Sequence, residues 1–414
     1  MKRVFSVVLL LATVMMLGGC YDYSEPDEKA WILALGLDKG KQNVLTVTAV
    51  IAIPKAIAGG GGGEPAAGGA GGGTFFTVSM ETPTLLSFLE LLDTVVDRRA
   101  DMSQTKWLVC SRELAEDIGI GKYFGPITRF SQFRRSVHVI ICEGRAEDFL
   151  EQGKPILEDN VGKYYELLMR GWRYTEFIPF DTFHFLHLKS NTIGVAPVAP
   201  LAALNRKEPV YDDNTPKPKG AYQAGRLPRR GGGEIEVMGG AVFKAGRMVG
   251  TLDADQVGVQ KMFFGNLKRT IMDVPDPEHP GFFIIVDVKP RYNPRVDVRI
   301  GEDDLPEISV EVGLEGTIMS IQSGEEYETP DRLPVLEQAV ERAYLEDINK
   351  TVAKSQALGA DFLGLGLHAK KLFLTWPQWV AYDWDTKYPD ATINVSVDYR
   401  VRRVGLIHET VPLK

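Results

Sequence analysis

The sequence predicts an α+β protein with several mixed domains, in which mainly antiparallel sheets are flanked by helices. β-rich runs and amphipathic runs come in blocks, whereas a doubly wound sheet would alternate them strictly. Segments rich in glycine or proline interrupt the chain at 58–73 and 205–233. The 414 residues are enough for two or three domains of roughly 100–200 residues each.

The start of the chain has the pattern of a signal peptide. Lys2 and Arg3 precede the apolar run Val4–Leu17, and two glycines follow before Cys20. The run is shorter than the roughly 20 residues that span a bilayer. Small residues directly before a cysteine are typical of bacterial lipoproteins, so we expect residues 1–19 to be removed and Cys20 to carry diacylglycerol. An ordinary secretory signal is the alternative.

Region 20–204 is predicted to be the first α+β region. Trp31–Asp38 and Val44–Ile53 are β-rich and joined by a turn-like sequence, which predicts a hairpin. The glycine-rich run 58–73 lacks the Gly-Lys-Ser/Thr ending of a phosphate-binding loop, so we expect a flexible loop. Further strands are expected at Thr74–Ser79, Lys106–Cys110 and Val137–Cys142, and helices at Thr82–Val96, Arg112–Ile118, Ala146–Leu150 and Asn160–Arg170.

The clearest change in composition lies at 205–233, which is rich in proline, glycine and charge. We expect a linker or long loop here, followed by a second α+β region at 234–414. A further boundary near residue 300 would divide this region into two subdomains. Strands are expected at Glu236–Lys244, Arg247–Gly250, Phe282–Val288, Arg295–Ile300, Ile308–Ile318 and Ile393–Val401, and helices from Thr329 onward and at Trp376–Tyr388.

Charge and motifs argue against several classes of protein. The net charge of −8 and the lack of a Lys/Arg-rich run argue against a nucleic-acid partner. The sequence contains no Gly-x-Ser-x-Gly, His-Glu-x-x-His or Walker motif. We therefore predict no enzyme, no cofactor and no metal.

Two short patterns imitate ligand-binding motifs. His184 and His187, with Asp181 nearby, have a loose metal-ligand spacing, but their neighbours are apolar and no third strong ligand is evident. The glycines at Gly364 and Gly366 match part of a dinucleotide fingerprint but follow a helix rather than a strand. We expect structural roles for both patterns.

Two cysteines besides Cys20 lie in strand-like runs, Cys110 and Cys142. Export permits a disulfide between them. Two lone cysteines in a large domain are more often free and buried, so both states remain open at this point.

Aromatic side chains are concentrated near the C-terminus, at Trp376, Trp379, Tyr382, Trp384 and Tyr388. One interpretation is a helix that packs on the last sheet. The other is a partner-binding surface, because Trp and Tyr are enriched at the energetic centres of interfaces. On that interpretation Trp376, Trp379, Tyr382 and Trp384 are the candidate interface residues.

Several blocks of sequence occur in the order found in a known family. They are Cys20–Asp22, Leu33–Asp38, Leu108–Ala115, Gly144–Leu150, Gly239–Lys244, Met248–Asp253, Ala360–Gly366, Trp376 with Trp379, and Val401–Leu406. In this order, behind the leader, the chain resembles the spore germination C-subunit lipoproteins, the Ger(x)C family. It departs from the family at Tyr21, where tryptophan is common.

The resemblance implies a non-catalytic, lipid-anchored subunit of a nutrient germinant receptor in a spore-forming bacterium. Such subunits sit on the outer face of the spore inner membrane, beside a transporter-like subunit and a second integral-membrane subunit. The membrane contact would be the diacylglycerol on Cys20. The alternative is a lipid-anchored solute-binding protein of a transporter, which should have alternating βα units in two lobes.

Overall fold

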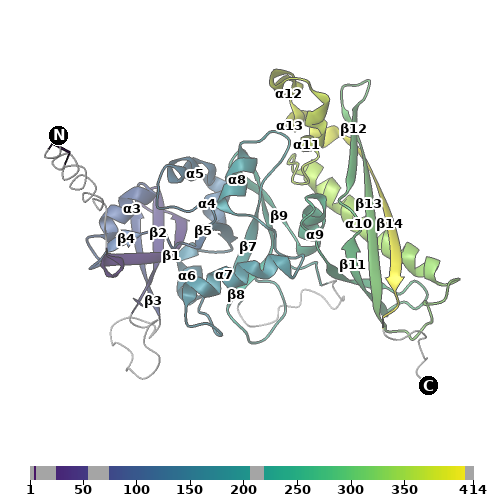
Figure 1. Ribbon diagram of the computed structural model, residues 1–414, viewed down its shortest axis with the longest axis horizontal. Coiled ribbons are helices and arrows are strands. Elements are labelled where there is room, and N and C mark those ends of the chain that lie inside the picture. Colours follow the sequence, from purple (N-terminus) through teal and green to yellow (C-terminus); the bar gives the residue numbers. More distant parts are fainter. Residues whose placement is uncertain (1–3, 6–24, 55–73, 206–218, 406–414) are drawn as a thin grey trace.

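The computed structural model describes residues 4–5, 25–54, 74–205 and 219–405. A nine-stranded sheet and a five-stranded sheet lie one after the other along the long axis of the molecule (Figure 1). Cys20, the glycine-rich run and the middle of the predicted linker lie outside the described residues.

The first sheet has a parallel centre and antiparallel sides. Its order is β3-β2-β1-β5-β6-β7-β8-β9, with β4 also paired to β1. The pairs from β1 through β5 and β6 to β7 are parallel, and the outer pairs are antiparallel. The strands are β1 (Lys29–Lys39), β2 (Leu45–Ala52), β3 (Phe75–Thr82), β4 (Arg99–Asp101), β5 (Trp107–Ser111), β6 (His138–Cys142), β7 (Val198–Leu204), β8 (Ile235–Lys244) and β9 (Arg247–Leu252).

Helices cover both faces of this sheet. One face packs against α3 (Leu85–Leu92), α4 (Arg112–Asp117), α5 (Gly121–Thr128) and α8 (Phe183–Ser190), and the other against α6 (Ala146–Gln152) and α7 (Val161–Met169). The buried carboxylate of Asp38, at the end of β1, accepts hydrogen bonds from the first two backbone N–H groups of α6 at 2.8 and 3.0 Å. This bond fixes α6 to the sheet.

The segment predicted as a linker or long loop joins two neighbouring strands of the first sheet. β7 and β8 lie on either side of it and pair antiparallel from Val198 with Val242 to Leu204 with Ile235. The first sheet therefore continues beyond residue 233 and ends at β9.

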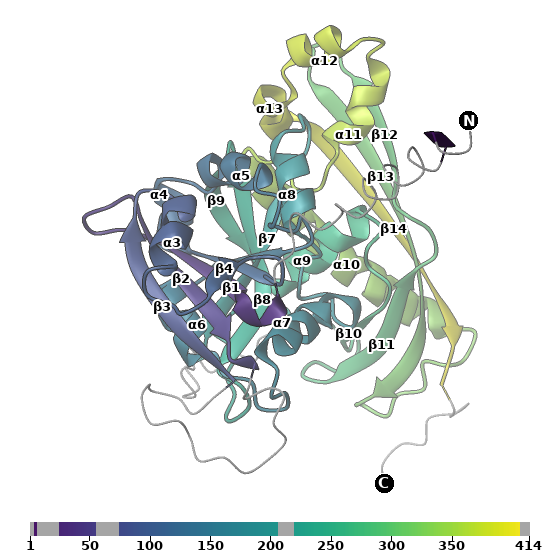
Figure 2. The same cartoon turned by 60° about the vertical axis from the view of Figure 1, so that its left-hand side comes forward.

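The second sheet presents one covered face and one open face. Its order is β10-β11-β13-β12, with all of these pairs antiparallel. A fifth strand, β14, pairs with β13 and runs parallel to it. The elements are β10 (Thr270–Pro275), β11 (Phe283–Pro290), β12 (Arg295–Ile300), β13 (Pro306–Ile321), β14 (Thr392–Arg403), α9 (Ala254–Phe263) and α10 (Leu333–Ala357). Apolar residues of α10 cover the inner face, and α9 lies between the two sheets (Figure 2).

These observations confirm the α+β class, with mostly antiparallel pairs and flanking helices. The predicted strands and helices of both regions are present, with ends shifted by a few residues, except that the helix predicted at Trp376–Tyr388 is divided into shorter helices. The parallel centre of the first sheet is a detail that the prediction did not contain.

Candidate functional site

The four candidate interface residues divide into one exposed and three buried side chains. Trp376 is 52% exposed, whereas Trp379, Tyr382 and Trp384 are buried. The ring of Trp379 lies 5.3 Å from that of Phe373 and 5.9 Å from that of Trp384. The prediction of a partner surface is therefore wrong for these three residues, because enclosed rings offer no area to a partner.

The single helix predicted over this segment is two helices, α12 (Trp376–Tyr382) and α13 (Trp384–Lys387). They are separated by Asp383, whose φ of 54° lies in the left-handed region that non-glycine residues seldom adopt. The change of direction lets Trp384 enter the core, where its ring stacks 5.6 Å from that of Tyr388.

Asp361 is a buried polar residue that contacts one of these rings, that of Trp384. Its buried carboxylate accepts hydrogen bonds from the backbone N–H groups of Gly364, Leu365 and Gly366 at 2.7–3.1 Å and from Nε1 of Trp384 at 3.2 Å. Burial raises the pKa of Asp361 to about 7, against the lowering effect of these bonds. The glycines that resemble a dinucleotide motif thus enclose a carboxylate of the chain itself, which confirms their structural role.

The same turn contacts the connection between α8 and β7. A Cβ atom on Gly366 would lie 2.4 Å from Cα of Gly194, so the two backbones meet closely enough to require glycine. The backbone N–H of Ala196 donates to the carbonyl of Asp361 at 2.7 Å. The C-terminal helices are therefore held directly against the end of the first sheet.

The outward side of this supported segment is apolar and basic. Leu374 is 94% exposed, and Leu372, Trp376 and Val380 are 45–52% exposed. Nζ of Lys370 lies 4.9 Å from the centre of the Trp376 ring, a cation–π contact.

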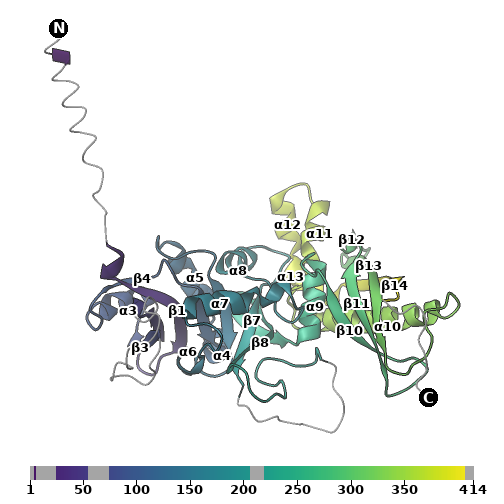
Figure 3. The same ribbon diagram turned by 60° about the horizontal axis from the view of Figure 1, so that its bottom comes forward.

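We call residues 370–380 the tip. It includes the first five residues of α12, which lies at an edge of the folded region beside β12 in three views of the ribbon (Figures 1, 2 and 3). Of the candidate residues, Trp376 is the one that belongs to this outward surface. The exposed leucines were not predicted, because a leucine beside aromatic residues has the sequence pattern of a core position.

The histidines of α8 do not form a metal site with Asp181. The carboxylate of Asp181 is buried and pairs with Nζ of Lys189 at 3.1 Å, and burial raises its pKa to about 6. The ring of His187 stacks on Phe183, with centroids 6.0 Å apart. Among the described residues, these side chains are not grouped as ligands of one ion.

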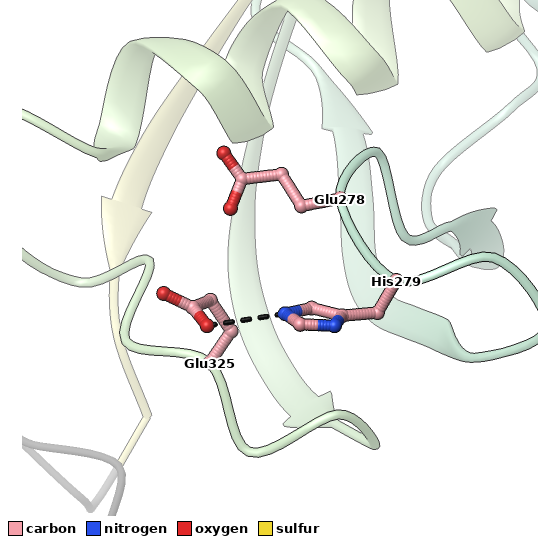
Figure 4. A group of neighbouring side chains, drawn as sticks. All are labelled: Glu278, His279 and Glu325. Carbon is pink, nitrogen blue, oxygen red and sulfur yellow. Dashed lines mark hydrogen bonds and ion pairs between the residues drawn. The ribbon is translucent and has the colours of Figure 1, made fainter.

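One group of potential metal ligands does occur in the described part of the chain, at Glu278, His279 and Glu325 (Figure 4). Nε2 of His279 lies 3.1 Å from a Glu325 oxygen. Arg332 forms ion pairs with both glutamates, at 3.0 Å to Glu325. Because this guanidinium already compensates the carboxylates, the group is an ion-pair network that ties the start of α10 to the end of the second sheet.

An acidic cavity of about 60 Å³ lies where α9, β10 and α10 meet a loop of the first region. Glu176, Asp255 and Asp347 line it, together with Lys219 and Tyr344. Burial raises the pKa of Glu176 and Asp347 to about 7 and that of Asp255 to about 6. This cavity was not predicted, because its carboxylates come from segments that are distant in the sequence.

The cysteines Cys110 and Cys142 are free and buried. Cys110 packs with the α4 and α5 side of the first sheet, and Cys142 with the α6 and α7 side. A disulfide cannot form through the sheet. Burial raises the pKa of both thiols, which keeps them protonated and unreactive.

Comparison with known proteins identifies the family. The model of the spore germination protein N-terminal domain matches residues 22–204, and the model described as spore germination B3/GerAC like, C-terminal, matches residues 238–405. The chain belongs to the Ger(x)C family. The two family matches are separated by residues 205–237, although the first sheet continues across this segment.

Relatives and a solved structure agree with this assignment. Spore germination protein KC of Bacillus subtilis is 25% identical over 98% of this chain and 97% of its own length. Spore germination protein A3 of the same organism is 23% identical over 36% of this chain and 39% of its own. The crystal structure of the GerBC protein matches with a TM-score of 0.54 and 14% identity, over 89% of this chain and 96% of that one, and supports the fold.

Among the described residues, no helix is both long and apolar enough to cross a bilayer.

Proposed function

We propose that this Ger(x)C protein is a non-catalytic subunit of a spore germinant receptor, attached to the outer face of the spore inner membrane by diacylglycerol on Cys20. The observation that carries the proposal is the pair of family matches, which together extend from residue 22 to residue 405 directly after the leader and its cysteine. The partners would be a transporter-like subunit and a second integral-membrane subunit.

A role through contacts, without catalysis, agrees with the pairing of three polar groups described above. Asp361 is engaged by backbone N–H groups, Asp181 by Lys189, and the Glu278 cluster by Arg332. Each group therefore has a structural use. The names of the relatives refer to germination.

Lipid attachment would act through effective concentration. Two acyl chains hold a protein stably at a bilayer, which one chain does not. Docking on membrane-embedded partners then becomes nearly intramolecular, so interfaces of modest affinity are sufficient.

The test is affinity purification of the tagged full-length protein from spore inner membrane, followed by mass spectrometry. Recovery of a transporter-like subunit with a second membrane subunit would support the proposal. Recovery of an ABC permease would instead favour a solute-binding protein. The Cys20→Ala variant is the control for anchoring, and normal membrane retention of this variant would contradict the role given to the lipid.

A further inference from the structure

The exposure of the tip is a fixed feature of the fold. Phe373 lies between two outward leucines and turns inward, with its ring 5.3 Å from Trp379 and 5.0 Å from Tyr382. Tyr382 in turn donates a hydrogen bond to the backbone carbonyl of Asp304 in the β12–β13 turn, at 3.3 Å. With Phe373 anchored in this way, Leu372 and Leu374 are held outward, at 49% and 94% exposure.

The charge of the tip differs from that of the whole chain. No acidic residue occurs from Gly366 to Tyr382, although the chain has a net charge of −8. Lys370 and Lys371 are both exposed beside the apolar side chains. Residues 370–380 are thus cationic and apolar on an acidic protein, and the acidic turn at 302–304 adjoins the end of α12 at Tyr382.

This combination fits a bilayer surface better than a protein surface. Trp favours the membrane–water interface, leucines enter the acyl boundary, and lysines attract anionic headgroups. A stable protein–protein interface takes roughly 20–30 residues from each partner. The tip has 11 residues, from 370 to 380, so it is too small to form such an interface by itself.

We infer that the tip inserts its outward side chains into the interfacial layer of an anionic phospholipid bilayer. Leu374 and Leu372 would enter the acyl boundary, Trp376 would lie at the headgroups, and Lys370 and Lys371 would contact phosphates. The inference rests on the proposed function in one respect, the location at a membrane. It adds a second contact with the bilayer, far from Cys20 in sequence, which would restrict how the protein is oriented.

The chain offers a matched pair of positions for a test. Leu157, between α6 and α7, is 95% exposed, nearly the same as Leu374. The α6–α7 side lies away from α12 in Figure 1. Leu374→Cys and Leu157→Cys can each be labelled with an environment-sensitive dye, because Cys110 and Cys142 are buried.

The full-length protein is reconstituted in vesicles that contain phosphatidylglycerol, with and without a lipid-borne quencher. We expect a blue shift and about twofold quenching at position 374 and neither effect at position 157. In Lys370→Gln/Lys371→Gln, the quenching at 374 should fall and lose its dependence on salt.

Three results would overturn the inference. The first is equal quenching at positions 374 and 157, and the second is no quenching at position 374. The third is shielding of position 374 only in native membranes that contain partner subunits, because the tip would then contact a protein. Failure of the anchor is separate, because it appears as loss of vesicle flotation and as dye attached to Cys20. The dye at 374 still reports on the tip in that case, after vesicles are added to the free chain.

Discussion

The two sheets differ in how much of their surface is buried. The central strands of the first sheet, β5, β6 and β7, are buried on both faces, since helices lie on either side. In the second sheet, β13 and β14 alternate between buried or half-buried and exposed positions, because α10 covers one face and solvent meets the other.

This difference indicates a division of roles. The first sheet uses its side chains to build a closed framework. The second sheet keeps an open polar face, and the segment between α10 and β14 carries the tip.

The largest effect is expected from removing a buried tryptophan in each half. Trp384→Ala should lower the free energy of unfolding by about 3–5 kcal/mol, because it opens a cavity and leaves Asp361 with one donor fewer. Trp107→Ala should cost about as much, since its ring stacks 4.1 Å from Tyr165 and its Nε1 donates to the Tyr165 carbonyl. Urea unfolding followed by circular dichroism measures both.

The number of unfolding transitions shows whether the two halves of the protein unfold together. The core cluster of the second sheet includes Val198, Val242 and Leu252 of the first, so we expect one shared transition in both variants. Two separated transitions, with each variant shifting only one, would mean that the halves unfold independently.

A smaller loss in the free energy of unfolding is expected on replacing Lys261, a buried lysine that joins the two halves. Nζ of Lys261 in α9 donates to the carbonyls of Trp172 and Thr175 at 2.7 and 2.6 Å. Lys261→Met should lower the free energy of unfolding by about 2 kcal/mol, because both carbonyls lose their donor. The exposed Lys268→Met is the control, and an equal effect in the two variants would contradict the prediction.

The acidic cavity should make stability depend on pH. The pKa values of Glu176, Asp255 and Asp347, about 6–7 when folded, lie above those of the unfolded chain. Their stabilising contribution is therefore full below pH 4 and is lost as the pH rises through 6–7. Between pH 5 and 8, the free energy of unfolding should therefore fall by about 1–2 kcal/mol less in Asp347→Asn than in the unmodified protein. Urea unfolding measured at several pH values in this range tests the prediction. The control is Asp297→Asn on the open face of the second sheet, which should leave the pH dependence of the free energy of unfolding unchanged.

The smallest effect is expected at the tip. Leu374→Ser should change the free energy of unfolding by less than about 0.5 kcal/mol, because the side chain is 94% exposed and has little to lose. A loss comparable to that of Trp384→Ala would mean that Leu374 is covered in the native protein.

Strands were easier to predict than the positions of single side chains. The alternation in β14 and the apolar stripe of α10 are properties of the sequence, and both elements are found. By contrast, α9 was missed because it is buried nearly all round and includes the buried polar residues Gln260 and Lys261, so it has no amphipathic pattern.

The prediction of interface residues was wrong for three of the four because their positions depend on packing. The burial of Trp384 depends on the left-handed turn at Asp383, which divides the segment that was predicted as one helix. The exposed leucines of the tip depend on the inward turn of Phe373 between them. Both are decided by packing across distant segments.

The length of β13 has a structural consequence. Its 16 residues extend over about 50 Å. One end adjoins the turn that holds Tyr382 and Lys387, and the other leads to the ion pairs of Arg332. The strand therefore links, as one continuous element, the turn that contacts Tyr382 to the ion-pair network at the other end of the second sheet.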